Sequence, residues 1–207
     1  ELGEALIPKS DDAYVAMGLY ANMGITLQAL GELERALEAY QSTYESALEA
    51  GRVLTQAQSL LNIATIYSND YEDYESAIEY YQRSLVLSEA NDLTYGVMLN
   101  HLNIAVAFWG LGRVDEAMAS FNQAKDMAQT LDRPNEMRHI LMQMSEFLAE
   151  SGRFDEAYAL KLEENEIAER LFNESREQTI ADLRVEYETE IAQQALALAE
   201  AENEQQS

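Results

Sequence analysis

Apolar and small residues recur along this chain with the spacing of one face of an α-helix. In the segment LLNIATIY they fall three, one and three positions apart, at Leu60, Ile63, Ala64 and Tyr67. The segment HLNIAVAF at residues 101–108 repeats the pattern. Short breaks follow such segments, and three of them contain a glycine, which ends helices well: Gly31, Gly112 and Gly152. The pattern predicts a succession of helical hairpins.

Two series of small residues repeat with the same period. The first series closes each LNIA-like motif, in steps of 40, 41 and 40 residues: Gly24, Ala64, Ala105 and Ser145. The second follows each break, in steps of 41, 40 and 40 residues: Ala36, Ala77, Ala117 and Ala157. We therefore expect four units, at about residues 13–52, 53–92, 93–132 and 134–172. The second unit has the break SNDYEDY, which lacks glycine and is one residue longer.

The repeat resembles the tetratricopeptide repeat, which places a small residue on its first helix and an alanine with a following aromatic on its second. GITLQALGELERALEAY (24–40) and AVAFWGLGRVDEAMASF (105–121) carry the resemblance best, whereas the fourth unit has Lys161 in place of the aromatic residue. The long period is similar to that of kinesin light chain and bacterial peptide-sensing regulators. The resemblance implies an all-α fold: a right-handed α-solenoid of four hairpins over residues 1–172, with a concave face that binds partners.

An amide side chain stands two residues before each small residue of the first series: Asn22, Asn62, Asn103 and Gln143. Two helical steps rotate this position by about 200° from the packing face, so we expect the amides to face the groove. An amide both donates and accepts, and can therefore pair with any peptide backbone. The resemblance implies an asparagine ladder that grips an extended peptide, with Gln143 as a longer variant. The alternative is that these amides bond to neighbouring helices or face water.

The same helical geometry places several other side chains toward the groove: Leu61, Thr65, Leu102, Val106, Trp109, Met142 and Glu146. Trp109 is the sole tryptophan, and it either packs partly into the core or anchors an apolar residue of a ligand. The expected groove is mixed and mildly apolar. It lacks the basic side chains that would hold a terminal carboxylate.

Residues 173–207 form a segment that we expect to be one extended helix. Its apolar residues, spaced three, four and four apart, make a stripe suited to a coiled coil and hence to a homodimer: Ile180, Leu183, Tyr187 and Ile191. The segment FNESREQTIADLRVEYETEIAQQ resembles the helix that follows repeat sensors in bacterial transmembrane signalling proteins. There it leads to a membrane span and an output domain, commonly a GGDEF diguanylate cyclase or a histidine kinase. The resemblance implies a periplasmic part of an inner-membrane protein; a cytoplasmic location is the alternative.

The composition of the chain excludes several classes of ligand and of catalytic chemistry. The net charge is −25, which opposes binding to nucleic acid or to anionic lipid, and the absence of Cys excludes disulfides and thiolate chemistry. The two histidines, His101 and His139, have no carboxylate motif that would make a zinc site, and we expect His101 to be a half-buried packing residue. No phosphate-binding glycine loop or nucleophile motif occurs, so we expect no enzyme activity and no cofactor.

These observations favour a non-catalytic sensor that binds a peptide or protein segment in its groove and relays binding through the C-terminal helix. A passive dimeric scaffold and a soluble intracellular peptide-sensing regulator are the alternatives. No run of 18 apolar residues is present, so any membrane association of this segment would come through an adjoining span.

Overall fold

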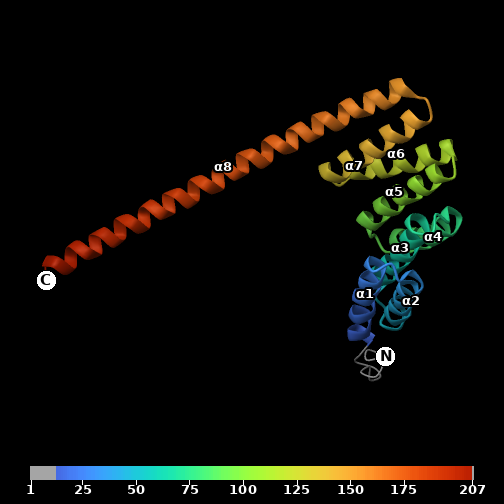
Figure 1. The fold of residues 1–207 in the computed structure, drawn as a ribbon, viewed down its shortest axis with the longest axis horizontal. Coiled ribbons are helices and arrows are strands. Elements are labelled where there is room, and N and C mark those ends of the chain that lie inside the picture. The colour runs from blue at the N-terminus through green and yellow to red at the C-terminus, as the bar shows by residue number, and fades with distance from the viewer. Residues whose placement is uncertain (1–12, 207) are drawn as a thin grey trace.

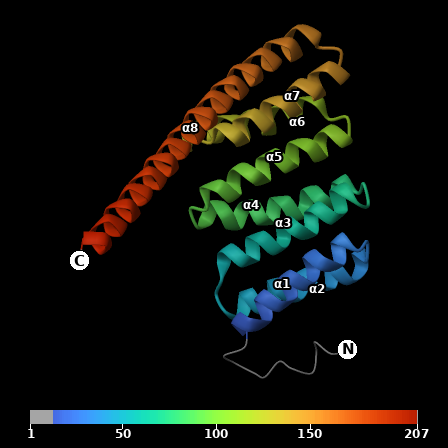
Figure 2. The same ribbon diagram turned by 60° about the vertical axis from the view of Figure 1, so that its left-hand side comes forward.

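The chain forms a helical solenoid followed by one long helix. A computed structural model describes the backbone of residues 13–206 and the side chains of residues 14–194. The helices follow one another as α1 (Ala13–Ala29), α2 (Leu33–Glu49), α3 (Val53–Asn69), α4 (Tyr74–Ala90), α5 (Thr94–Gly110), α6 (Val114–Thr130), α7 (Pro134–Glu150) and α8 (Phe154–Gln206). Consecutive helices pack as hairpins that stack in chain order (Figures 1 and 2). The predicted all-α solenoid of four hairpins is therefore confirmed.

Each connection between helices contains one residue in the left-handed conformation. Glycine fills this place in four connections, with φ of 64–77°: Gly31, Gly51, Gly112 and Gly152. Glu72, Asp92 and Asp132 fill it in the other three at φ of 49–55°, and Glu72 lies in the predicted break that lacks glycine. The Glu32 N–H donates to the Leu27 carbonyl at 2.9 Å and so closes the end of α1. The turn between α3 and α4 is one residue longer than the turn between α1 and α2, as its sequence predicts.

The two series of small residues lie where the helices of a hairpin approach each other most closely. Ala64 and Ala105 are fully buried, as are their partners Ala77 and Ala117. The aromatic residues of the second helices are buried with them: Tyr40, Tyr81 and Phe121. Small side chains are needed here because a larger one would separate the helices and open voids in the core.

The fourth hairpin departs from this arrangement, as its sequence indicates. Lys161 takes the place of the aromatic residue, is largely exposed, and pairs with the carboxylate of Glu164 at 2.7 Å. Ser145 replaces the small apolar residue of α7, and its hydroxyl donates to the Ala157 carbonyl of α8 at 2.9 Å. A hydrogen bond thus joins these two helices where an aromatic ring does so in the other hairpins.

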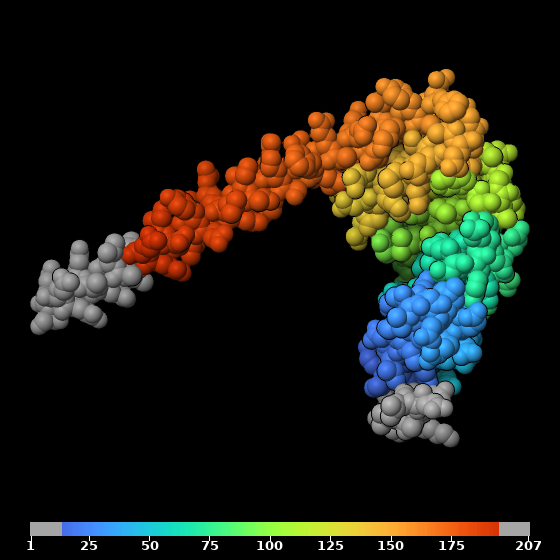
Figure 3. Space-filling model, in the orientation of Figure 1, coloured from blue at the N-terminus to red at the C-terminus, as the bar shows by residue number. Residues whose placement is uncertain are grey.

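α8 serves both as the second helix of the fourth hairpin and as the extended tail. It runs without interruption for 53 residues, and beyond Leu171 every described side chain is exposed. Figure 3 shows this part projecting from the solenoid as a separate arm. Within the part of the chain that the structure describes, no helix combines the length and apolar character needed to cross a membrane.

Candidate functional site: a cavity on the concave face

The first helices of the hairpins line the concave side of the solenoid. α3 contacts both α1 and α5, whereas contacts between the second helices are few or absent. Because neighbouring hairpins are closer together at their first helices than at their second helices, the stack of hairpins curves toward the first helices. Over the first three hairpins the concave face is therefore formed by the first helices α1, α3 and α5, as expected from the resemblance.

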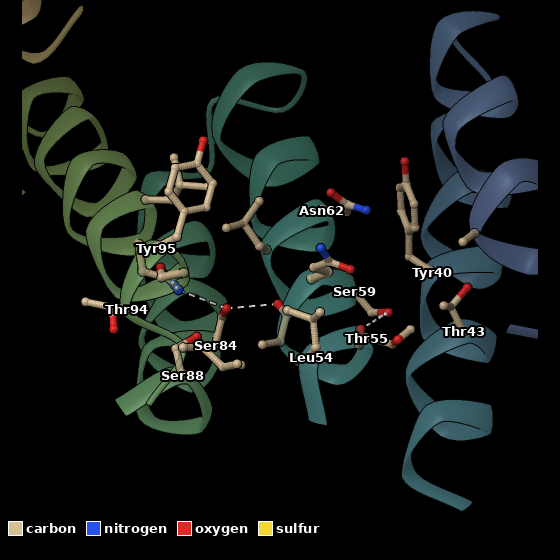
Figure 4. Close-up of a pocket in the computed structure, with 18 of the residues that line it drawn as sticks. Tyr40, Thr43, Leu54, Thr55, Ser59, Asn62, Ser84, Ser88, Thr94 and Tyr95 are labelled. Atoms are coloured by element: carbon tan, nitrogen blue, oxygen red, sulfur yellow. Dashed lines mark hydrogen bonds between the residues drawn. The ribbon is translucent and has the colours of Figure 1, made fainter. Parts of the chain in front are cut away.

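A cavity of about 550 Å³ opens on this face around α3; we call it the α3 cavity. Its lining comprises Ala21, Ile25, Tyr40, Thr43, Leu54, Thr55, Ala57, Gln58, Ser59, Leu61, Asn62, Ser84, Ser88, Leu93, Thr94, Tyr95, Gly96, Leu99 and Asn100. In Figure 4, α3 lies in the centre, with Tyr40 and Thr43 on one side and Ser84, Ser88 and Tyr95 on the other. The size is typical of pockets that bind small molecules or single side chains.

The mouth of the α3 cavity is apolar and its floor is polar. Leu54 and Tyr95 stand at the mouth and are 55% and 44% exposed. Ser84, Ser88 and Asn100 form the floor and are almost completely buried. None of the lining residues is charged, although a quarter of the whole chain is. An uncharged lining on a chain of net charge −25 favours a neutral occupant.

Burial keeps the tyrosine at the inner edge of the cavity neutral. Tyr40 is 2% exposed, and burial raises the pKa of its hydroxyl above the ordinary value. The hydroxyl donates to Gln28 Oε1 at 3.3 Å. Tyr40 therefore contributes a fixed, uncharged wall.

The four predicted amides occupy different environments. Asn62 is half-buried and lines the α3 cavity between Tyr40 and Tyr95 (Figure 4). Asn103 is half-buried and Asn22 is exposed, and neither lines this cavity. Gln143 is half-buried, and its Oε1 has no hydrogen-bond partner among the described residues. Only Asn62 therefore belongs to the cavity, and the role of the series as a ladder stays a prediction.

The other predicted groove residues are partly committed to internal contacts. The Thr65 hydroxyl donates to the Leu61 carbonyl at 2.9 Å and lies 3.3 Å from the Tyr81 hydroxyl. Trp109 is half-buried, packs on Phe147 with ring centroids 5.6 Å apart, and donates from Nε1 to Glu150 at 2.9 Å.

Leu102 is only 5% exposed, so the expectation that it faces the groove is wrong. It packs into the core between the third and fourth hairpins. Glu146 is exposed and lines none of the cavities described above.

The histidines lie apart from the α3 cavity. His101 is half-buried, as expected, and burial lowers the pKa of its imidazole while the charge of Glu89 opposes this shift. His139 is exposed on α7. Among the described residues, no three His, Asp or Glu side chains cluster as metal ligands would.

The predicted apolar stripe of α8 faces solvent. Its residues are about half to two-thirds exposed, at 58%, 58%, 64% and 48%: Ile180, Leu183, Tyr187 and Ile191. No other helix of the described chain covers them. Apolar side chains aligned on an exposed helix are typical of a surface that a partner covers.

Residues of the cavity floor escaped prediction because they lie on the sides of the helices that face the next hairpin, away from the amide series. A comparison of equivalent positions in the repeats could have identified these floor residues. Ser88 occupies the position held by Ala47 and Ala128, and Asn100 occupies that of Ile140. These two polar residues replace apolar ones of the third and fourth hairpins, which distinguishes the interface at the α3 cavity from the next one along the solenoid.

Comparisons with known proteins agree with this architecture. A family model described as "Tetratricopeptide repeat" matches residues 14–90, and another of the same description matches residues 100–131. No curated protein matches the sequence significantly.

Several solved structures share the fold. BtubC (BKLC) from P. vanneervenii has a TM-score of 0.71 and 20% identity, over 79% of this chain and 67% of that one. The apo form of RapI has a TM-score of 0.71 and 14% identity, over 77% and 44% of the two chains. Aspartyl phosphate phosphatase F from Bacillus subtilis has a TM-score of 0.55 and 15% identity, over 73% and 49%. This chain thus spans less than half the length of the latter two proteins.

Proposed function

This chain is built of tetratricopeptide repeats, and on that premise we propose that it is a non-catalytic interaction module that binds a segment of another protein on its concave face. The observation that carries the proposal is the α3 cavity, which combines an apolar mouth, a polar floor and an uncharged lining. Cavities of this composition bind apolar groups and fix their orientation through a few hydrogen bonds.

The polar side chains along the groove support recognition of a protein backbone. Asn62 borders the cavity, and Asn103 stands one unit further along, so both amides can pair with peptide groups of a segment laid across the first helices. Such contacts do not depend on the sequence of the segment. The cavity then supplies the selectivity that the amides lack.

We extend the proposal to relay and dimerisation through α8. Because α8 is also the second helix of the fourth hairpin, a change in solenoid curvature on binding would reorient the arm. The exposed stripe of the arm fits a second copy of the same helix, because its three- and four-residue spacing matches a coiled-coil seam. An output domain of the signalling type would receive this change of orientation.

Selection of peptides from a random phage-displayed library, followed by affinity measurement, tests the binding proposal. Leu54 and Leu48 are equally exposed, at 55% and 57%, but only Leu54 lines the α3 cavity. We expect Leu54→Asp to weaken the selected peptides at least tenfold and Leu48→Asp to change their affinity less than twofold. Equal effects of the two substitutions, or failure to select any peptide that depends on Leu54, would contradict the proposal.

A further inference from the structure

The floor of the α3 cavity is organised by a chain of hydrogen bonds that ends in an unpaired oxygen. Asn100 Nδ2 donates to the Gly96 carbonyl at 2.9 Å and to Ser84 Oγ at 3.0 Å, and Ser84 Oγ donates to the Ala57 carbonyl at 2.9 Å. A carbonyl can only accept, so the amide orientation of Asn100 is fixed. Its Oδ1 is then left with no hydrogen-bond partner among the described residues.

A second buried polar atom on the same floor also lacks a partner. Ser88 is 1% exposed, and no described residue forms a hydrogen bond with its Oγ. Room for this hydroxyl depends on Gly96, because a Cβ there would lie 3.0 Å from it. A buried polar group without a partner destabilises the folded chain. Two residues that line the α3 cavity therefore each carry such a group, and both oxygens are buried beneath the cavity surface.

Packing of the solenoid does not require them. At the matching interface between the third and fourth hairpins, the same three positions are apolar and fully buried: Ala124, Ala128 and Ile140. Between the first and second hairpins, Thr43 and Ser59 donate to carbonyls of their own helices at 2.9 and 2.8 Å, so their hydroxyls are paired. Two of the three unpaired buried side-chain oxygens of the described residues, those of Ser88 and Asn100, belong to residues that line the α3 cavity; the third is Gln143 Oε1 on α7.

The chemistry of the lining restricts what can pair with them. A cation would enter without a carboxylate to balance it, and an anion would enter against a net charge of −25. The occupant is therefore neutral and largely apolar, and it carries a donor for Asn100 Oδ1. Among protein side chains, tyrosine and tryptophan combine an apolar body with such a polar tip.

We propose that the α3 cavity is the anchor pocket for a tyrosine or tryptophan side chain of the bound segment, whose O–H or N–H pairs with the unpaired floor groups Asn100 and Ser88. This inference rests on the proposed function, because it names the side chain that the groove selects. The side chain enters past Leu54 and Tyr95, which are exposed enough to change rotamer rapidly. A tyrosine hydroxyl can both donate to Asn100 Oδ1 and accept from the Ser88 hydroxyl.

N-acetyl-tyrosinamide and N-acetyl-tryptophanamide are suitable probes, with N-acetyl-phenylalaninamide as the control that lacks only the donor. Binding is followed by NMR through the backbone amide of Gly96 and the side-chain amide of Asn100 in the full chain. We expect saturable shifts with the first two probes and at least fivefold weaker binding of the third. Equal binding of tyrosinamide and phenylalaninamide would overturn the proposal.

Substitutions taken from the matching interface separate binding from folding. Ser88→Ala with Asn100→Ile copies Ala128 and Ile140, so we expect a thermal midpoint at or above that of the unchanged chain and loss of the preference for tyrosinamide. Ser88→Ala alone removes one group with minimal disturbance and should reduce the preference partially. A preference retained by both variants would show that the floor does not bind the donor.

The peptide selection distinguishes this inference from the broader function. Enrichment of tyrosine or tryptophan at one fixed position of the selected peptides supports both. Peptides that depend on Leu54 but show no such enrichment would leave the binding function standing and refute the anchor pocket.

Discussion

Tyr40 of α2 lies against Gly24 of α1 so closely that a Cβ added to the glycine would stand 2.7 Å from the ring. The ring is 2% exposed, so an added methyl group at residue 24 would have to displace a packed side chain. We expect Gly24→Ala to destabilise the chain, because overpacking costs about 1–3 kcal/mol, more than the gain of about 0.5–1 kcal/mol from replacing glycine in a helix. Urea denaturation measures the difference.

Gly18 provides the matched control in the same helix. A Cβ at Gly18 meets no atom within 4 Å, so Gly18→Ala should leave the stability unchanged or raise it slightly. If the two alanine variants unfold at the same urea concentration, the close approach to Tyr40 does not constrain this position.

The amide series makes a prediction about binding. Asn62→Ala and Asn103→Ala should each weaken a peptide from the display selection by roughly fivefold to tenfold, since one hydrogen bond contributes about 1 kcal/mol. Fluorescence anisotropy with that peptide measures the change. Asn122→Ala, at an exposed position on α6, serves as the control. Unchanged affinity in both groove variants would rule out a ladder.

His101 makes the stability depend on pH. Burial lowers the pKa of its imidazole from 6.5, so the unfolded chain binds the proton more readily than the folded chain does. The free energy of unfolding should therefore fall as the pH drops below about 6.5. Leucine occupies the same position in other units, at Leu60 and Leu141, which makes His101→Leu a well-matched variant.

Urea midpoints at pH 7.5 and pH 5 for the two proteins test this prediction. Both proteins carry the same carboxylates, so the difference between them reports the histidine together with its interaction with Glu89. The unchanged chain should lose more stability on acidification than His101→Leu does. Parallel losses would indicate that the histidine has the same proton affinity in the folded and unfolded states.

The arm makes a prediction about association. Leu183→Glu with Tyr187→Glu places charge on the apolar stripe, and Val185→Glu with Thr189→Glu places the same charge on another exposed face of the helix. Sedimentation equilibrium should show dimers of the original chain and of the second variant. The first variant should dissociate about 100-fold more readily, because it loses about 3 kcal/mol of apolar contact. A monomeric original chain would refute dimerisation through the arm.

Sequence periodicity predicted the fold well because each repeat supplies an independent copy of the same constraint. The small residues at Ala64 and Ala105 recur because close packing of the two helices requires a small side chain there. The same packing requirement can therefore be read several times in one sequence. The lengthened turn after α3 was visible for the same reason, as a single departure from an otherwise constant spacing.

The candidate site was predicted only in part because it depends on departures from the repeat. Helical rotation placed Asn62 on the concave face, where it borders the cavity. The same reasoning wrongly placed Leu102 on the groove, because helical rotation alone takes no account of the neighbouring hairpin, which buries this residue. Asn100 of α5 and Ser84 of α4 meet across two helices, so their hydrogen bond depends on a tertiary contact that periodicity within one helix does not contain.

Because α8 is one continuous helix, a small tilt at its base moves its far end through a larger distance. At about 1.5 Å per residue, the part of the helix beyond Leu171 extends roughly 50 Å from the solenoid. A tilt of about 5° at its base, of the order that a small adjustment between packed helices produces, carries the far end through roughly 4 Å. A contact with one side chain in a groove could in this way be converted into a displacement comparable to the spacing between neighbouring turns of a helix.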